Sequence, residues 1–171
     1  MPGRSLNLHP VSTSPATGID VDILRVAPDL LSLSYSMRGD MANVIVPQMH
    51  PSTRSDGLWK HTCFEAFLGA RKGYYEFNFS PSTQWAAYRF DGHREGMREL
   101  ATDDPTIFWD GEAARLIVTI RLPSDVTGPL GLSAIVEDRT GNRSFWALAH
   151  PPGDPDFHHP ACFAAELPPA D

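Results

Sequence analysis

The sequence predicts an all-β protein built as a two-sheet antiparallel β-sandwich. Wherever the 171-residue chain has a pattern, apolar and polar residues alternate with the period of a half-buried strand. Gly, Pro, Asp or Asn interrupts these segments about every 8 to 12 residues, as in sandwiches and barrels. No long window keeps the helical period with a cap at its start. A closed barrel is the alternative architecture.

The strands follow from the same alternation, taken in chain order. In LSLSYSM, residues 31–37, the apolar side chains fall on one face and the serines on the other. The remaining predicted strands are 21–26 (VDILRV), 43–46 (NVIV), 63–68 (CFEAFL), 74–80 (YYEFNFS), 84–90 (QWAAYRF), 106–109 (TIFW), 115–122 (RLIVTIRL), 132–138 (LSAIVED) and 144–149 (SFWALA). Residues 92–102 (GHREGMRELAT) are predicted as a short helix or turn.

Length and composition favour one domain. A hydrophobic content of 42% suffices for a single core. Residues 1–18 are predicted to be a flexible N-terminal segment, and residues 19–168 the sandwich domain. The segment has no apolar stretch of the kind found in a signal peptide, and no later apolar run approaches the roughly 18 residues of a membrane span. We therefore expect a soluble, cytoplasmic protein without a membrane partner.

The charge argues against nucleic acid as a partner. The formal net charge is -7, and the chain contains no basic run that would contact a phosphate backbone. The two cysteines, Cys63 and Cys162, are far apart in sequence. A small disulfide scaffold would carry more cysteines at closer spacing, so both are predicted to be reduced and buried, with a long-range disulfide as the alternative.

Common enzyme motifs do not occur. The chain lacks a Gly-x-Ser-x-Gly elbow, a P-loop, a dinucleotide fingerprint and a His-Glu-x-x-His motif. His150, His158 and His159 lie in a Pro-rich stretch, but their spacing matches no zinc module. We predict loop histidines that bond backbone groups or face a ligand, with no metal, no cofactor and no catalytic residue.

One carboxylate stands out within an apolar segment. Glu65 is flanked by Phe64 and Ala66 and follows Trp59 by six residues. If its side chain points inward, the ionised form needs a partner such as an arginine or ligand hydroxyls. The alternative is a glutamate on a solvated face.

Three segments together resemble the family-nine carbohydrate-binding modules and the wider DOMON-like superfamily. They are LWKHTCFEAFL, YYEFNFSPSTQWAAYRF and the terminal FHHPACF. In that pattern a Trp precedes a Glu-containing strand, a Tyr-Glu-Phe strand and a Ser-Pro turn follow, and the chain closes with an aromatic residue, a Pro and a Phe. Phe157, Pro160 and Phe163 match that close. The resemblance covers residues 20–168 and implies a jelly-roll, DOMON-like β-sandwich.

The resemblance also implies a ligand site. It places Trp59 and Phe157 on the two sides of an aromatic clamp around a sugar, and Glu65, Arg89 and Asp154 at the sugar hydroxyls. Such a site is physically sound, because sugars have apolar C–H faces and a rim of hydroxyls. A fully extended chain would separate Trp59 from Glu65 by about 20 Å, so we expect a bend between them, with Trp59 in the preceding loop.

Four positions depart from the family pattern. His61 and Thr62 replace two acidic residues, which removes the carboxylates available to a structural calcium ion. Phe157 stands where the family usually has Trp, and Asp154 where it has an amide; an ionised carboxylate accepts hydrogen bonds but does not donate them.

The expected function is that of a non-catalytic domain that binds a carbohydrate or sugar-like small molecule. Three alternatives stay open. Some DOMON relatives bind haem through Met and His, which directs attention to Met49, His50 and His61. A small metal-dependent hydrolase would use the region of His150, His158, Asp154 and Glu65. An interaction domain for a protein or another metabolite is the third.

Overall fold

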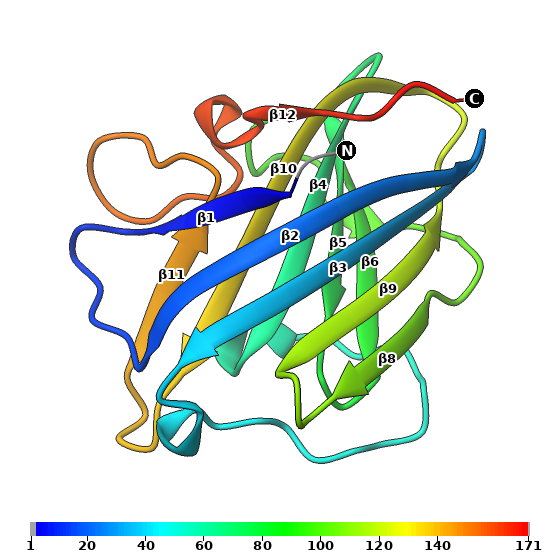
Figure 1. Cartoon of the computed structure of the whole chain (residues 1–171). Coiled ribbons are helices and arrows are strands. Elements are labelled where there is room, and N and C mark those ends of the chain that lie inside the picture. The colour runs from blue at the N-terminus through cyan, green and yellow to red at the C-terminus, as the bar shows by residue number, and fades with distance from the viewer. Residues whose placement is uncertain (1–2, 171) are drawn as a thin grey trace.

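The computed structural model describes residues 3–170, and within that range it contains twelve β-strands and three short 3₁₀ helices (Figure 1). No helix among these residues is long and apolar enough to cross a membrane. The strands are β1 (Arg4–Leu8), β2 (Ala16–Ala27), β3 (Leu30–Gly39), β4 (Cys63–Ala70), β5 (Tyr74–Phe79), β6 (Trp85–Phe90), β7 (Arg98–Glu99), β8 (Thr106–Asp110), β9 (Arg115–Arg121), β10 (Val126–Glu137), β11 (Arg143–Ala147) and β12 (Ala165–Glu166). The 3₁₀ helices are η1 (Met41–Asn43), η2 (Leu58–Lys60) and η3 (Pro160–Cys162).

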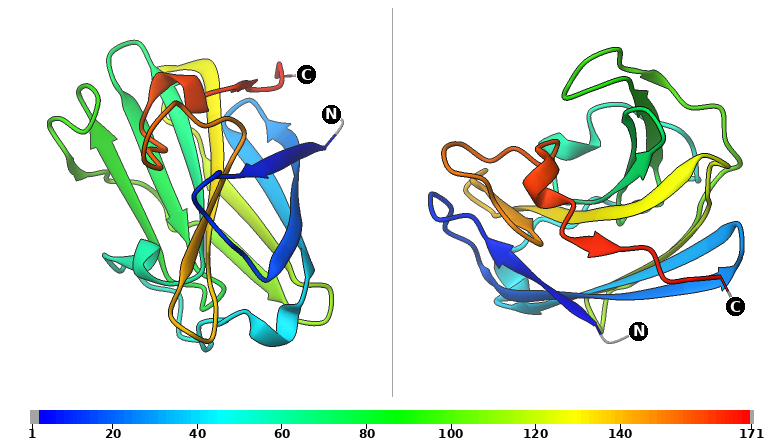
Figure 2. Two further views of the ribbon diagram at one scale, coloured as in Figure 1. Left: turned by 90° about the vertical axis from the view of Figure 1, so that its left-hand side faces the viewer. Right: turned by 90° about the horizontal axis from the view of Figure 1, so that it is seen from above.

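The strands form two antiparallel layers. One layer has the order β8-β9-β3-β2-β1, and the other has the order β7-β6-β5-β4-β10-β11, with β12 paired to β10. Strand β1 belongs to both, because Arg4, Ser5 and Leu6 pair with β2 while Asn7 and Leu8 pair with β11. Figure 2 shows the layers stacked and the second one curled. The predicted two-sheet antiparallel sandwich is confirmed.

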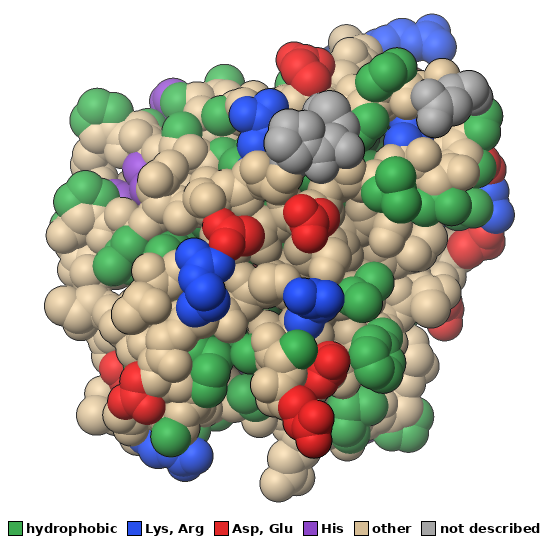
Figure 3. Space-filling model, viewed as in Figure 1, with side chains coloured by type: hydrophobic (Ala, Val, Ile, Leu, Met, Phe, Trp, Pro, Cys, Tyr) green, Lys and Arg blue, Asp and Glu red, His purple; other side chains and the backbone are tan. Residues whose placement is uncertain are grey.

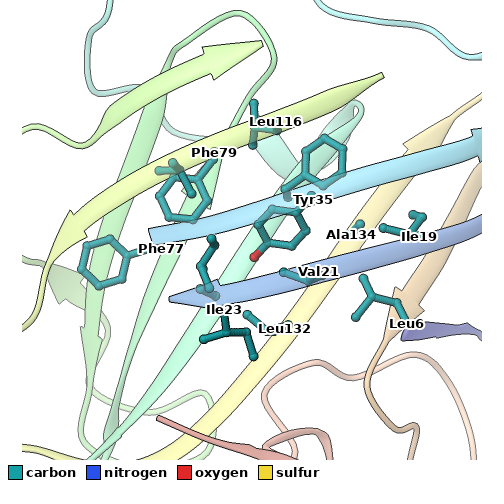
Figure 4. Close-up of a cluster of buried hydrophobic side chains, with 14 of the residues drawn as sticks. Leu6, Ile19, Val21, Ile23, Tyr35, Phe77, Phe79, Leu116, Leu132 and Ala134 are labelled. Carbon is teal, nitrogen blue, oxygen red and sulfur yellow. The ribbon is translucent and has the colours of Figure 1, made fainter. Parts of the chain in front are cut away.

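Alternating apolar side chains fill the space between the layers. Ile19, Val21 and Ile23 of β2 are buried together with Leu31, Leu33 and Tyr35 of β3. They meet side chains of the second layer, among them Phe77, Phe79, Leu132 and Ala134, as Figure 4 shows. Burying one such side chain contributes roughly 1.5–3 kcal/mol, so this cluster is the main source of stability.

The opposite, outer side of the first layer is solvated. Exposed ion pairs join Arg38 to Asp20 and Arg121 to Asp29 and Asp103. Figure 3 shows acidic and basic side chains interspersed on this face. Exposed pairs of this kind contribute roughly 0–1 kcal/mol each, and they mark an ordinary hydrated surface.

The second layer is buried on both faces. Strands β4 and β5 have six consecutive buried residues each. One face contacts the main core, and the other carries a second apolar cluster: Phe67, Tyr74, Ala86, Tyr88, Phe90, Ile135, Ala147 and Phe157. Residues 148–163, the loop after β11, run along the outer side of the second layer (Figure 2), and Phe157 of this loop belongs to that second cluster. The outer face of β4, β5 and β6 is therefore covered rather than exposed.

Several elements differ from the sequence-based expectations. The structure places β1 and the start of β2 inside residues 1–18, because the apolar Leu6 packs in the core and the backbone of β1 completes both layers. Residues 43–46 form no strand, and only Val44 makes an isolated bridge, to Asp138. Residues 92–102 form turns and the two-residue β7 rather than a helix.

The cysteine prediction is confirmed. Cys63 and Cys162 are both buried and both free thiols.

Candidate functional site

A cavity of about 420 Å³ lies on the outer face of the second layer. Its walls are largely aromatic and apolar, from Trp59, Tyr88, Phe90, Met97, Ile135, Phe145, Pro155 and Phe157. Its polar lining consists of Glu65, Glu76, Asn78, Arg94 and His158. The size and the mixture of many apolar walls with few polar groups are typical of small-molecule sites.

Strand register brings three of the polar side chains to one surface. Glu65 on β4 lies opposite Asn78 on β5, and on its other side opposite Ser133 on β10. Glu76 lies opposite Phe67, two residues beyond Glu65 on the same strand. Since side chains two residues apart share a face, Glu65 and Glu76 are diagonal neighbours on the floor of the cavity.

Glu65 is a buried carboxyl without a complete set of partners. Its side chain is buried, with the residue 3% exposed, and its Oε2 atom has no hydrogen-bond partner among residues 3–170. Burial raises the pKa of Glu65 well above its ordinary value, and the neighbouring Glu76 carboxyl raises it further. Asn78 is 1% exposed, and its Oδ1 atom likewise has no partner in that range. The floor of the cavity thus presents unused acceptors.

Glu76 is held beside a neutral histidine. Burial raises the pKa of Glu76 to about 7, against the opposing effects of the Asn78 hydrogen bond and the Arg94 charge. Nε2 of His158 lies 3.7 Å from Oε2 of Glu76, and Nδ1 of His158 bonds the Tyr74 hydroxyl at 2.7 Å. Burial, with the Arg94 charge as a second cause, lowers the pKa of His158 to about 4. His158 is therefore uncharged at neutral pH.

Two loops are fastened to each other at the cavity rim. Asp156, in the loop after β11, accepts hydrogen bonds from Nη2 and Nε of Arg94 at 2.9 and 3.2 Å. It also bonds Nε2 of His93 at 2.7 Å. Arg94 and His93 lie in the loop after β6, so Asp156 fixes Phe157 and His158 over the outer face of the sheet.

Trp59 forms another part of the wall. It lies in η2, where the chain bends before β4 begins at Cys63, and this is the bend that the sequence predicts between Trp59 and Glu65. The indole is 46% exposed and has two cations near its ring, Arg143 at 5.7 Å and Lys60 at 5.8 Å from the centroid. An apolar surface thus remains open to a ligand.

The structure brings Trp59, Glu65 and Phe157 to the cavity but not the other two residues of the sequence-based site. Arg89 alternates with Tyr88 and Phe90 on β6 and so faces the other way. Its guanidinium stacks on the Tyr75 ring at 4.5 Å and pairs with Asp125 at 3.4 Å. Asp154 is exposed in the loop and does not line the cavity.

Sequence reasoning missed three polar residues of the lining, Glu76, Asn78 and Arg94, and named His158 only as a loop histidine that bonds backbone groups or faces a ligand. The alternation in YYEFNFS already places Glu76 and Asn78 on one face, which was the available signal. That this is also the face of Glu65 depends on the β4–β5 register. For Arg94, a loop residue, the sequence carries no comparable signal.

The other histidines make local contacts. His150 bonds the backbone oxygen of Asn7 at 2.7 Å, and Nδ1 of His159 accepts from the Ala161 amide at the start of η3. Within residues 3–170, no three His, Cys, Asp or Glu side chains are grouped so as to hold a metal ion. Met49, His50 and His61, considered for haem, are exposed and lie outside the cavity lining.

Comparison with known proteins identifies similar folds. No protein family profile and no curated protein matches the chain. A crystal structure of a candidate carbohydrate-binding protein from Bacteroides uniformis ATCC 8492 is similar over 94% of this chain and 83% of its own, with a TM-score of 0.59 and 13% identity. A family 9 carbohydrate-binding module from Caldicellulosiruptor kristjanssonii, in complex with cellotriose, has a TM-score of 0.47 and 14% identity over 95% of this chain and 80% of its own.

These likenesses concern the fold. The fold implied by the resemblance to family-nine modules, an antiparallel β-sandwich, is confirmed. The fold and the cavity together define a β-sandwich protein with a small-molecule type of site on the outer face of its curled sheet. Membership of the DOMON-like superfamily stays a prediction from the sequence.

Proposed function

We propose that this chain is a non-catalytic carbohydrate-binding domain whose ligand, a sugar or sugar-like small molecule, occupies the cavity over β4, β5, β6 and β10. The observation that carries the proposal is the pair of buried acceptors, Oε2 of Glu65 and Oδ1 of Asn78, that lack partners within residues 3–170 and line an aromatic-walled cavity.

The chemistry of these acceptors favours a hydroxyl-rich ligand. A buried polar atom without a hydrogen bond costs roughly 1–3 kcal/mol, and a ligand that donates to it recovers that free energy on binding. Sugar hydroxyls donate to Glu65 and Asn78, while the C–H faces of the ring pack on Trp59 and Phe157. The half-exposed Arg94 at the rim donates to Asp156 through Nε and Nη2, and its Nη1 group is the donor proposed for the sugar.

This residue set modifies the one inferred from the sequence. Trp59, Glu65 and Phe157 are retained, and Asn78 and Arg94 take the places of Asp154 and Arg89, which lie outside the cavity lining. The description of the Bacteroides uniformis protein as a candidate carbohydrate-binding protein supports the same ligand class.

The test is calorimetric titration of the purified protein with a panel of mono- and oligosaccharides. Glu65→Ala removes a hydrogen-bond partner of the sugar hydroxyls, worth roughly 0.5–1.5 kcal/mol, and should weaken binding about two- to tenfold. Trp59→Ala removes a half-exposed stacking surface and should weaken it about three- to tenfold. After prolonged incubation the oligosaccharides should be recovered intact.

Asp154→Ala and Arg89→Ala are the matched controls. Both residues belong to the sequence-based site, and both lie outside the cavity. Asp154→Ala should leave the affinity unchanged. A lack of binding across the panel contradicts the proposed function, and loss of binding in Asp154→Ala but not in Glu65→Ala contradicts the proposed location.

A further inference from the structure

The floor of the cavity contains buried oxygens without protein partners. Oε2 of Glu65 and Oδ1 of Asn78 have no hydrogen-bond partner among residues 3–170, and the same holds for the buried Oγ of Ser133, which lies opposite Glu65 on β10 but outside the cavity lining. Two unused buried oxygens on the floor favour a ligand group that carries several donor hydrogens.

The positive groups at the cavity are already engaged. Arg94 makes two hydrogen bonds to Asp156, and that ion pair cancels much of its charge. His158 uses one ring nitrogen on the Tyr74 hydroxyl and is neutral, because burial holds its pKa near 4. Among residues 3–170, no ion pair joins Glu65 or Glu76 to an arginine or lysine, and the Arg94 charge only partly favours their ionised forms.

The two carboxyls are too close to ionise together in a buried place. They are diagonal neighbours on adjacent strands, and each raises the cost of charging the other. A bound cation between them would offset this repulsion and let both carboxyls carry their charge. A carboxylate on the ligand would add to the repulsion.

We propose that the ligand of this cavity is an amino sugar whose protonated amine lies between Glu65 and Glu76, an inference that rests on the proposed carbohydrate-binding function. An ammonium group supplies three donors, which matches the acceptors on the floor. Its hydrogen bonds to carboxylates are roughly twice as strong as neutral ones. The rings of Tyr88 and Phe90 line the same cavity and add a favourable surface for a cation.

The experiment compares D-glucosamine, N-acetylglucosamine, D-glucose and D-glucuronic acid, with the β-1,4-linked trimers of the first three, by calorimetry at about pH 6. We expect glucosamine and its trimer to bind about tenfold or more tightly than the glucose counterparts. N-acetylation, which removes the charge but keeps the ring, should abolish that preference. Glucuronic acid should bind most weakly.

Charge-removing variants test the placement of the amine. Glu65→Gln and Glu76→Gln keep the shape of the side chain, and each should reduce the ratio of glucosamine to glucose affinity below about threefold. Asp154→Ala, which changes an exposed carboxyl outside the cavity, should retain the full ratio. Thermal unfolding of each variant confirms that it is folded.

The outcomes separate the two proposals. Equal affinity for glucosamine and glucose, or a preference for glucose, overturns the amino-sugar inference and leaves carbohydrate binding standing. A preference for glucosamine that persists in both glutamine variants also overturns it. Failure of every sugar to bind overturns the proposed function together with this inference.

Discussion

At the scale of single residues, the notable feature is a pair of acidic side chains in an apolar setting. Buried carboxyls are usually paired with a cation, yet Glu65 and Glu76 face mainly each other, Asn78 and a neutral His158. Such an arrangement costs folding free energy, and it is retained more readily where a ligand supplies the missing partners. The two residues thus connect stability to binding.

The pH dependence of stability tests this description. Because the pKa of Glu76 is about 7 in the folded chain and 4.5 ordinarily, the folded state holds its proton more tightly than the unfolded state does. The free energy of unfolding of the protein without ligand should therefore fall as pH rises from about 4.5 to about 7. In Glu76→Gln this fall should shrink by up to about 3 kcal/mol.

Denaturant unfolding curves across that pH range provide the measurement. Glu112→Gln changes an exposed carboxyl in the turn before β9 and should follow the unsubstituted protein. A free energy of unfolding that rises over this range, or an unchanged profile in Glu76→Gln, would show that Glu76 is not buried as described.

At the scale of elements, β1 has the most informative position. It is only five residues long, but it pairs with β2 at one end and with β11 at the other, and so joins the two layers at their edge. Leu6 is buried in the main core from this strand. Strand β1 therefore contributes both backbone hydrogen bonds to the two layers and a side chain to the core.

Leu6→Ala should destabilise the protein by about 2–4 kcal/mol, because it removes a buried side chain and leaves a cavity in the core. Val11→Ala, in the exposed loop after β1, should change the free energy of unfolding by less than about 0.5 kcal/mol. Urea denaturation at constant pH measures both. If Leu6→Ala left the free energy of unfolding unchanged, residues 1–18 would instead behave as the flexible segment expected from the sequence.

At the scale of the whole molecule, the reactivity of the two thiols measures whether the protein unfolds as one cooperative unit. Cys63 lies on β4 and Cys162 in η3, and both are buried. Burial raises the pKa of Cys162 to about 11 and that of Cys63 well above its ordinary value. Since the thiolate is the reactive form, neither cysteine should react with a thiol reagent in the folded protein at about pH 8.

In concentrated guanidinium both thiols should react at once, at two per chain. In the folded protein the slow labelling rate should depend on denaturant in the same way as global unfolding. Fast labelling of Cys162 alone would indicate that the loop after β11 opens independently of the sandwich.

The fold class was predictable because alternation is a local property. Leu31, Leu33 and Tyr35 show the period of a strand without reference to any other segment. The short strands β1, β7 and β12 escaped prediction since their few residues carry too little pattern, and they exist because neighbouring strands offer backbone partners. Residues 43–46 show the reverse case, an apolar run whose pairing is limited to one bridge, from Val44 to Asp138 just beyond β10.

For the candidate site, the sequence by itself determined that Glu65 stands in an apolar strand. It also determined that one aromatic residue, Trp59, precedes that strand and another, Phe157, follows near the end of the chain. Only the tertiary structure decided which side chains share the cavity. It joined Glu76 and Asn78 to Glu65 through strand register, brought in Arg94 and His158 through loop packing, and turned Arg89 to the opposite face of β6. The physical reason is that facing and register depend on pairings between residues distant in sequence, whereas composition and alternation are local.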